Sequence, residues 1–357
     1  MEPRAFDLLR RLLDAPSPSG FEQAAARIWR EEAETFADEV TTDLMGNTFA
    51  LVRSASGSAN APKVLAAGHI DEIGFIVSQI DEQGFLWLQR LGGWDEQVIV
   101  GQRIRILGTQ GDVVGVIGKK AAHLLTPEDR DKPARLRDLW VDIGARDRAD
   151  AETRVEVGCA AVIDAHFLQI TDDLCVSRSM DNRVGAFVGL EAARQLAAER
   201  ASVDFVAVAT VQEETGLTGA RVAAFSAAPR VAIALDVTHA TDYPGADKHS
   251  NAEVTLGGGP VLSRGATLSP VVFQGLRDAA RRIDLPYQLQ ATGNNSGTDA
   301  DSMIESGPGT AAGLISIPNR YMHSPNEMVS LADLGACARL LAEFVRGVTP
   351  DSDFRPR

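Results

Sequence analysis

The chain has 357 residues, and its 35 Lys and Arg against 49 Asp and Glu give a formal net charge of −14. With 45% hydrophobic and 24% charged residues it has the composition of a folded globular protein, and its length predicts about two domains. The acidic excess argues against nucleic acid and anionic membrane partners, and no apolar run reaches the ~18 residues that span a bilayer.

The first third of the chain predicts helices followed by short strands. Apolar positions recur at helical spacing over residues 4–14 and again over 21–36, with the APSPSG segment ending the first helix. Short β-like runs follow at 43–52, around a Gly-Asn turn, and at 63–67. Within the second run, residues 64–67 (VLAA) are all apolar, which is typical of a buried strand.

The pattern changes between residues 73 and 165. Alternating apolar and polar stretches separated by glycines replace helical spacing, which predicts the antiparallel strands of a small barrel. A polar segment with two prolines, 126–137, predicts an exposed loop.

Helices and strands alternate in the remainder of the chain. This alternation favours an α/β fold, a mostly parallel sheet flanked by helices. The β-rich block, 73–165, is therefore predicted to form an inserted β-barrel domain. It interrupts a discontinuous α/β catalytic domain made of 1–72 and 166–357. The predicted helices are 184–196, 219–225, 269–283 and 331–345, and the predicted strands are 203–211, 231–235 and 314–317.

Cysteine usage and the N-terminus indicate a cytoplasmic protein. Cys159, Cys175 and Cys337 are odd in number, widely spaced and without a CxxC motif, which is typical of free thiols in a reducing compartment. The first 20 residues lack a basic start followed by an apolar stretch, so we expect no secretory signal.

Acidic and histidine side chains follow each apolar strand, where ligands bind in α/β proteins. Five separate segments supply one or two of them, and this recurrence favours a common site. The residues are His69 and Asp71, Asp181, Glu213 and Glu214, Asp236, and His323.

This set has the composition of a two-metal site. Zinc- and cobalt-like cations bind imidazole and carboxylate, and two cations ~3.5–4 Å apart need a shared carboxylate. Asp71, two residues after His69, can fix the tautomer of its ring, and Glu213 can serve as general base beside a liganding Glu214. Each residue also has a structural interpretation: Asp181 and Asp236 as helix N-caps, the two glutamates as first-turn charges, and a lone histidine as solvated. His239 is interpreted as structural or solvated.

The motifs together resemble the dinuclear-metal aminopeptidases of metallopeptidase family 42, which include tetrahedral (TET), glutamyl and deblocking aminopeptidases and relatives labelled endoglucanases. The resemblance runs from about residue 15 to 329. The segments that carry it are APSPSGFE, GHIDEIGFIV, SMDNRVGAF, VQEETGLTGA, ALDVTHATDYPG, LGGGPVLSRG, NSGTDAD and ISIPNRYMHSPNEMV.

The resemblance implies a role for each position. His69 and Asp236 bind one divalent metal, Glu214 and His323 the other, and Asp181 bridges them. Glu213 is the general base and Asp71 supports the liganding histidine. It also implies a cis peptide bond after Asp181, removal of N-terminal residues from peptides, zinc or cobalt as the metal, and self-association as a dimer or dodecamer.

Three other functions stay open on the sequence. An N-acyl-amino-acid deacylase could use the same metal pair, and a glycoside hydrolase could use Glu213 with a second carboxylate. A non-catalytic peptide-binding protein is the third. The sequence leaves the side-chain preference open, although the loops 292–299 and 319–321 are expected to line the pocket, and Lys248 and Arg320 could favour an acidic side chain.

Overall fold

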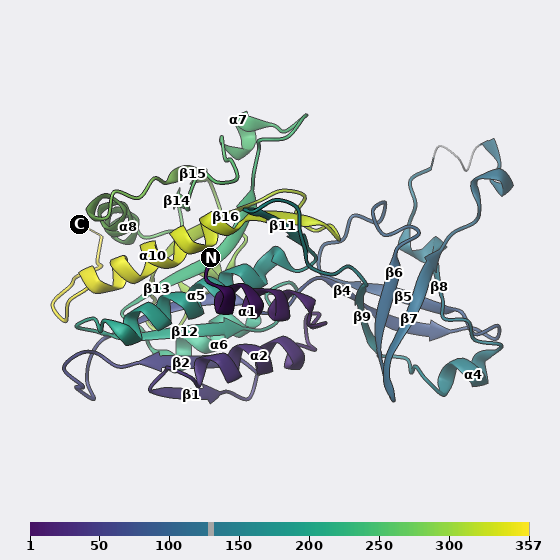
Figure 1. Ribbon diagram of the computed structural model, residues 1–357, viewed down its shortest axis with the longest axis horizontal. Coiled ribbons are helices and arrows are strands. Elements are labelled where there is room, and N and C mark those ends of the chain that lie inside the picture. Colours follow the sequence, from purple (N-terminus) through teal and green to yellow (C-terminus); the bar gives the residue numbers. More distant parts are fainter. Residues whose placement is uncertain (128–131, 357) are drawn as a thin grey trace.

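A twisted eight-stranded sheet forms the centre of the larger lobe (Figure 1). This computed structural model describes residues 1–127 and 132–356. The strand order is β1-β2-β12-β3-β13-β16-β14-β15, and four of the seven neighbouring pairs are parallel. The strands are β1 (Glu39–Thr42), β2 (Thr48–Val52), β3 (Lys63–His69), β12 (Asp204–Thr210), β13 (Val231–His239), β14 (Val261–Gly265), β15 (Gln288–Thr292) and β16 (Ala311–Asn319).

Helices cover both faces of this sheet, because its strands bury side chains on both sides. In β3, Val64 and Ala66 belong to one apolar core, while Leu65 and Ala67 belong to the other. The predicted α/β class with a mostly parallel sheet is confirmed. One face packs against α1 (Pro3–Asp14), α2 (Gln23–Ala33), α5 (Met180–Ala198), α8 (Pro270–Arg282) and α10 (Leu331–Gly347), and the other against α6 (Thr218–Ala227) and α9 (Asp299–Met303).

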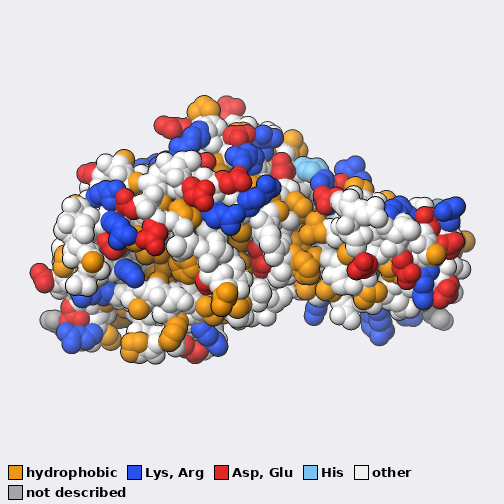
Figure 2. Space-filling model, turned by 90° about the horizontal axis from the view of Figure 1, so that it is seen from below, with side chains coloured by type: hydrophobic (Ala, Val, Ile, Leu, Met, Phe, Trp, Pro, Cys, Tyr) orange, Lys and Arg blue, Asp and Glu red, His pale blue; other side chains and the backbone are white. Residues whose placement is uncertain are grey.

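The predicted antiparallel barrel is also present, as a smaller lobe beside the sheet (Figure 1). The barrel has an apolar core separate from those of the large sheet, and in it Phe75 stacks on Trp94 with ring centroids 5.0 Å apart. Figure 2 shows two lobes joined by a narrower waist, with Lys, Arg, Asp and Glu interspersed over the face in view. The closed order is β4 (Gly74–Ile80), β5 (Leu86–Leu91), β8 (Trp140–Asp142), β7 (Gly111–Gly118), β6 (Arg103–Gly108) and β9 (Ala160–Ile163).

The loop predicted at 126–137 lies partly outside the described residues, because 128–131 are not among them. Its described part includes η2 (Leu136–Asp138), a single 3₁₀ turn, and η1 (Ala122–Leu124) comes just before it. The other short helices are α4 (Arg148–Glu152) and α7 (Lys248–Asn251).

A three-stranded antiparallel sheet was not predicted from the sequence. It consists of β10 (Leu168–Gln169), β11 (Leu174–Ser177) and β17 (Glu327–Ser330). Ser177 pairs with Glu327 in its register, so the segment leading to Asp181 lies beside the segment that follows His323.

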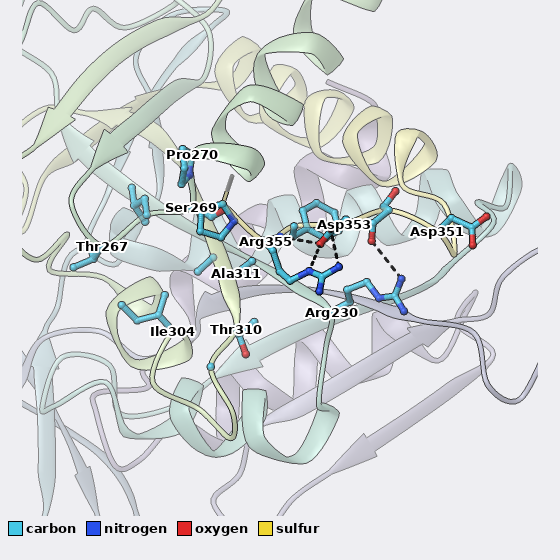
Figure 3. Close-up of a pocket in the computed structure, with 16 residues that line it drawn as sticks. Arg230, Thr267, Ser269, Pro270, Ile304, Thr310, Ala311, Asp351, Asp353 and Arg355 are labelled. Carbon is cyan, nitrogen blue, oxygen red and sulfur yellow. Dashed lines mark hydrogen bonds and ion pairs between the residues drawn. The ribbon is translucent and has the colours of Figure 1, made fainter.

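One cavity lies at the amino ends of β13 and β16, under the C-terminal tail (Figure 3). It has a volume of about 720 Å³, and Arg230 on its wall donates hydrogen bonds to the backbone oxygens of Pro350 and Ser352. No histidine among the described residues lines this cavity, and the histidines of the predicted metal site lie toward the opposite, carboxyl ends of the strands. None of the described helices is long and apolar enough to cross a bilayer.

Candidate metal centre

A second cavity, of about 420 Å³, opens at the carboxyl ends of β3, β12 and β13. His69 is the last residue of β3, and Glu213 and Glu214 follow β12. Asp236 lies inside β13 rather than at its end as predicted, because β13 continues beside β16 as far as His239. All six residues predicted to bind metal or act as base line this cavity: His69, Asp181, Glu213, Glu214, Asp236 and His323.

The N-terminal turn of α5 brings Asp181 to this cavity. A side chain on Gly68 would place its Cβ 2.5 Å from the backbone nitrogen of Ala186, so glycine lets the helix pack directly on β3 next to His69. The peptide bond between Asp181 and Asn182 is cis, as the family resemblance implied. The Asn182 side chain donates to the Leu235 carbonyl at 2.6 Å, which ties this turn to β13 beside Asp236.

Among the described residues, the nitrogen and oxygen atoms of the site form three overlapping sets: one of His69, Glu213 and Glu214, and two that share Asp181. Its Oδ1 lies 3.1 Å from His69 Nε2, and its Oδ2 lies 3.3 Å from His323 Nε2. Asp236 Oδ1 lies 3.9 Å from the first histidine, and Glu214 Oε2 lies 3.8 Å from the second. Within each set the donor atoms lie within 4.8 Å of one another.

The buried carboxylates of this cluster repel one another, and this favours the binding of cations. Burial and the nearby Asp236 and Asp299 carboxylates raise the pKa of Glu213 to about 10. Burial and neighbouring acids likewise raise the pKa values of Glu214 and Asp236 well above the usual range. No Lys or Arg lines the cavity among the described residues. A divalent cation would remove this repulsion, and the donor set of imidazole and carboxylate fits zinc-like metals.

Asp71 is fully buried and supports the site as a hydrogen-bond acceptor. Its Oδ1 lies 3.3 Å from His69 Nδ1. Its two carboxylate oxygens accept from the backbone N–H groups of Glu213 and Glu214, each at 3.2 Å. One side chain thus fixes the histidine ring and the loop that carries both glutamates.

Glu327 is a functional candidate that the sequence analysis missed. It is 2% exposed, and its carboxylate accepts from the backbone N–H of Asp181 at 2.9 Å and of His323 at 2.8 Å. It therefore joins two ligands that are far apart in the chain. The only signal in the sequence is its place in the HSPNEM segment.

A buried ion cluster beneath the site was also missed. Glu72, next to Asp71, lies 2.7 Å from Arg183 and 2.8 Å from Arg178, and all three side chains are almost fully buried. Arg183 follows Asp181 by two residues. The cluster therefore fixes the turn that presents Asp181.

The segment after β5 in the barrel lies close to two side chains of the site, those of Glu214 and His323. A Cβ on Gly92 would come 3.1 Å from Glu214 Oε2, and one on Gly93 would come 3.1 Å from the His323 ring. Hydrogen bonds to Asp181 and to the Gly93 backbone raise the pKa of His323. His239, interpreted from sequence as structural or solvated, also lines the cavity, and burial lowers its pKa.

Comparison with known proteins identifies the family. A family model described as M42 glutamyl aminopeptidase matches residues 46–340, which is most of the chain. The chain belongs to this family. It is 32% identical to a lysyl aminopeptidase of Pyrococcus furiosus over 98% of this chain and 99% of the relative. The M42 chain is accordingly a metal-dependent aminopeptidase, and the predicted family, hydrolase class and activity are confirmed.

Solved structures agree with this assignment. A TET aminopeptidase from Thaumarchaeota archaeon SCGC AB-539-E09 superposes with a TM-score of 0.92 at 34% identity, covering 98% of both chains. The TET1 peptidase of Pyrococcus horikoshii superposes with a TM-score of 0.86 at 26% identity, covering 96% of this chain and 100% of that one. The latter is described as assembling into a tetrahedron or a large octahedral shell.

Proposed function

We propose that this M42 aminopeptidase binds two divalent cations per subunit, with His69 and Asp236 on one, Glu214 and His323 on the other, and Asp181 between them. The observation that carries the proposal is that the two oxygens of Asp181 face different histidines, at 3.1 and 3.3 Å. A carboxylate in this position can bind one ion with each oxygen.

The spacing of the donor atoms supports this ligand set. Two ligands ~2.0–2.2 Å from a tetrahedral zinc ion are separated by roughly 3.3 Å. The four contacts from the histidines to the carboxylates span 3.1 to 3.9 Å. Imidazole with carboxylate suits zinc or cobalt, and we propose one of these as the native metal.

Glu213 is the proposed general base. When bound, the cations supply Lewis-acid polarisation of the scissile carbonyl and lower the pKa of the attacking water. The Glu213 carboxylate, 3.7 Å from His69 Nε2 and at the cavity wall, takes a proton from that water. It then delivers the proton to the departing amine, so the peptide bond is replaced by a new amine and a carboxylate. The Asp71 carboxylate holds Glu213 in place by accepting a hydrogen bond from the Glu213 backbone N–H.

The substrates we propose are peptides with a free N-terminal amine. The test uses metal-stripped protein, then protein loaded with zinc or cobalt, on unblocked and N-acetylated aminoacyl anilides. Glu213→Gln should retain its metal, measured by elemental analysis, and lose about 100-fold or more of kcat on the unblocked substrates. Wild-type turnover by Glu213→Gln would exclude it as the base, and preferential cleavage of acetylated substrates would indicate a deacylase instead.

We also propose that the inserted domain, 73–165, mediates self-association, while 1–72 and 166–357 form the catalytic domain. Val114 and Val116 lie on one face of β7 and are 54% and 47% exposed. Light scattering should give a mass above that of one chain, and Val114→Glu should lower it. A monomeric wild type would exclude the proposal.

The three free cysteines support a cytoplasmic location, which fractionation would test.

A further inference from the structure

A row of uncharged polar side chains extends from the metal centre across the edge of the sheet. In register, Asp236 on β13 lies beside Ser316 on β16, and Ser263 on β14 lies beside Gln290 on β15. Ser316, Ser263, Gln290 and Thr238 all line the 420 Å³ cavity. We call Thr238, Ser263 and Gln290 the polar wall.

One group of the polar wall, the Ser263 hydroxyl, is free to form a hydrogen bond to a ligand. Ser263 is 2% exposed, and its hydroxyl has no hydrogen-bond partner among the described residues. A buried hydroxyl without a partner is unfavourable, so its presence on a cavity wall points to a ligand that satisfies it. Thr238 donates to the Gln290 amide oxygen at 3.0 Å, and both residues line the cavity.

The nearby cations are engaged elsewhere. Arg320 forms two hydrogen bonds to Asp242, at 2.6 and 2.7 Å, and Arg264 lies over the Phe273 ring at 5.9 Å. Lys248 lies 3.9 Å from Glu253. None of these three cations lines the cavity, so among the described residues an acidic N-terminal side chain finds no Lys or Arg on the cavity wall.

We propose that the polar wall selects substrates whose N-terminal side chain is uncharged and hydrogen-bonding, of the glutamine and asparagine type, and rejects glutamate. The proposal rests on the aminopeptidase function above and adds its side-chain preference. Glutamine and glutamate side chains have nearly the same shape, so they differ here only in charge and in the amide N–H groups of glutamine. The Ser263 hydroxyl oxygen can accept a hydrogen bond from one of these N–H groups.

The experiment compares kcat/KM for X-Ala-Ala tripeptides with X as Gln, Glu, Met or Lys. Wild type should prefer Gln over Glu by about tenfold or more, because an unpaired buried carboxylate is costly. Ser263→Ala should lower the Gln value about fivefold and leave Met unchanged. Gln290→Lys should raise the Glu value relative to Gln about tenfold, by adding a cation at the wall.

Leu289→Lys is the matched control. It adds the same charge to the same strand at a neighbouring position that is 51% exposed and outside the cavity lining, so the ratio of Gln to Glu should stay within twofold. Calorimetric titration of the metal-loaded enzyme with free L-glutamine and L-glutamate measures the same preference without turnover. Glutamine should bind about tenfold more tightly.

The outcomes separate this inference from the proposed function. Turnover of all four peptides with Glu or Lys equal to or above Gln would overturn the specificity and leave the aminopeptidase intact. Absence of turnover on every peptide would count against the proposed function, and the calorimetry would still decide the preference of the wall. Unchanged Gln to Glu ratios in Gln290→Lys would also overturn the inference.

Discussion

Replacement of Glu327 tests whether one buried carboxylate holds the two halves of the metal centre together. Its oxygens accept from the backbone N–H groups of Asp181 and His323, at 2.9 and 2.8 Å. In Glu327→Gln one oxygen becomes an NH₂ group that faces a backbone donor. The variant keeps the size of the side chain and loses one of the two hydrogen bonds.

The expected effect is a weaker affinity for metal. A hydrogen bond to a charged group contributes ~1.5–3 kcal/mol, and loss of a residue that orients ligands typically costs ~10–100-fold in metal affinity. These estimates agree, because tenfold corresponds to about 1.4 kcal/mol. We expect the Kd for zinc to rise about 10–100-fold in Glu327→Gln and further in Glu327→Ala.

Asp333→Asn is the matched control for this prediction. Asp333 is 1% exposed, and its carboxylate also accepts from two backbone N–H groups, those of Gly257 and Gly259, both at 2.8 Å. It contacts no proposed ligand. Competition titration with a chelator gives the Kd, and thermal unfolding of the metal-free proteins gives the loss of stability. Equal metal affinity in Glu327→Gln and Asp333→Asn would refute the reasoning.

Three further predictions concern other parts of the structure. Asp71→Asn should lower kcat about 10–100-fold with little change in KM, because the loop carrying both glutamates loses an ionic acceptor; steady-state kinetics with metal analysis checks this. Native protein at pH 8 should react at one thiol with Ellman's reagent, that of Cys159, because burial raises the pKa of Cys175 to about 12 and that of Cys337 well above its usual range; three fast thiols would contradict it. Glu72→Ala should destabilise the fold by about 3–5 kcal/mol in urea unfolding, because it leaves two buried guanidinium groups unpaired.

The fold was predictable where the hydrophobic pattern was long and regular. The helix expected at 4–14 corresponds to α1, and the strand expected at 203–211 corresponds to β12. The sheet of β10, β11 and β17 was not predictable, because β10 has two residues and β17 merges with the start of α10. Such short strands are defined by tertiary pairing rather than by local pattern.

The candidate site was predictable to the extent that its residues follow strands. The structure brings together all seven predicted residues, while their individual roles stay predictions. Glu327 and Glu72 look like ordinary surface charges in the sequence, because burial and backbone partners are properties of the fold. Of the loops expected near the pocket, 292–299 contributes to the lining of the cavity, and beside 319–321 the lining comes from Met322 and His323.

If Asp181 binds two cations at once, each chain should hold two metal ions, and removal of this carboxylate should weaken both; metal stoichiometry measures this. Metal-stripped wild type and Asp181→Asn would be titrated with zinc and followed by calorimetry and elemental analysis. We expect two ions per chain in wild type and weaker binding of both in Asp181→Asn, since the shared ligand is lost. One ion per chain in wild type, or two ions bound with unchanged affinity in Asp181→Asn, would contradict it.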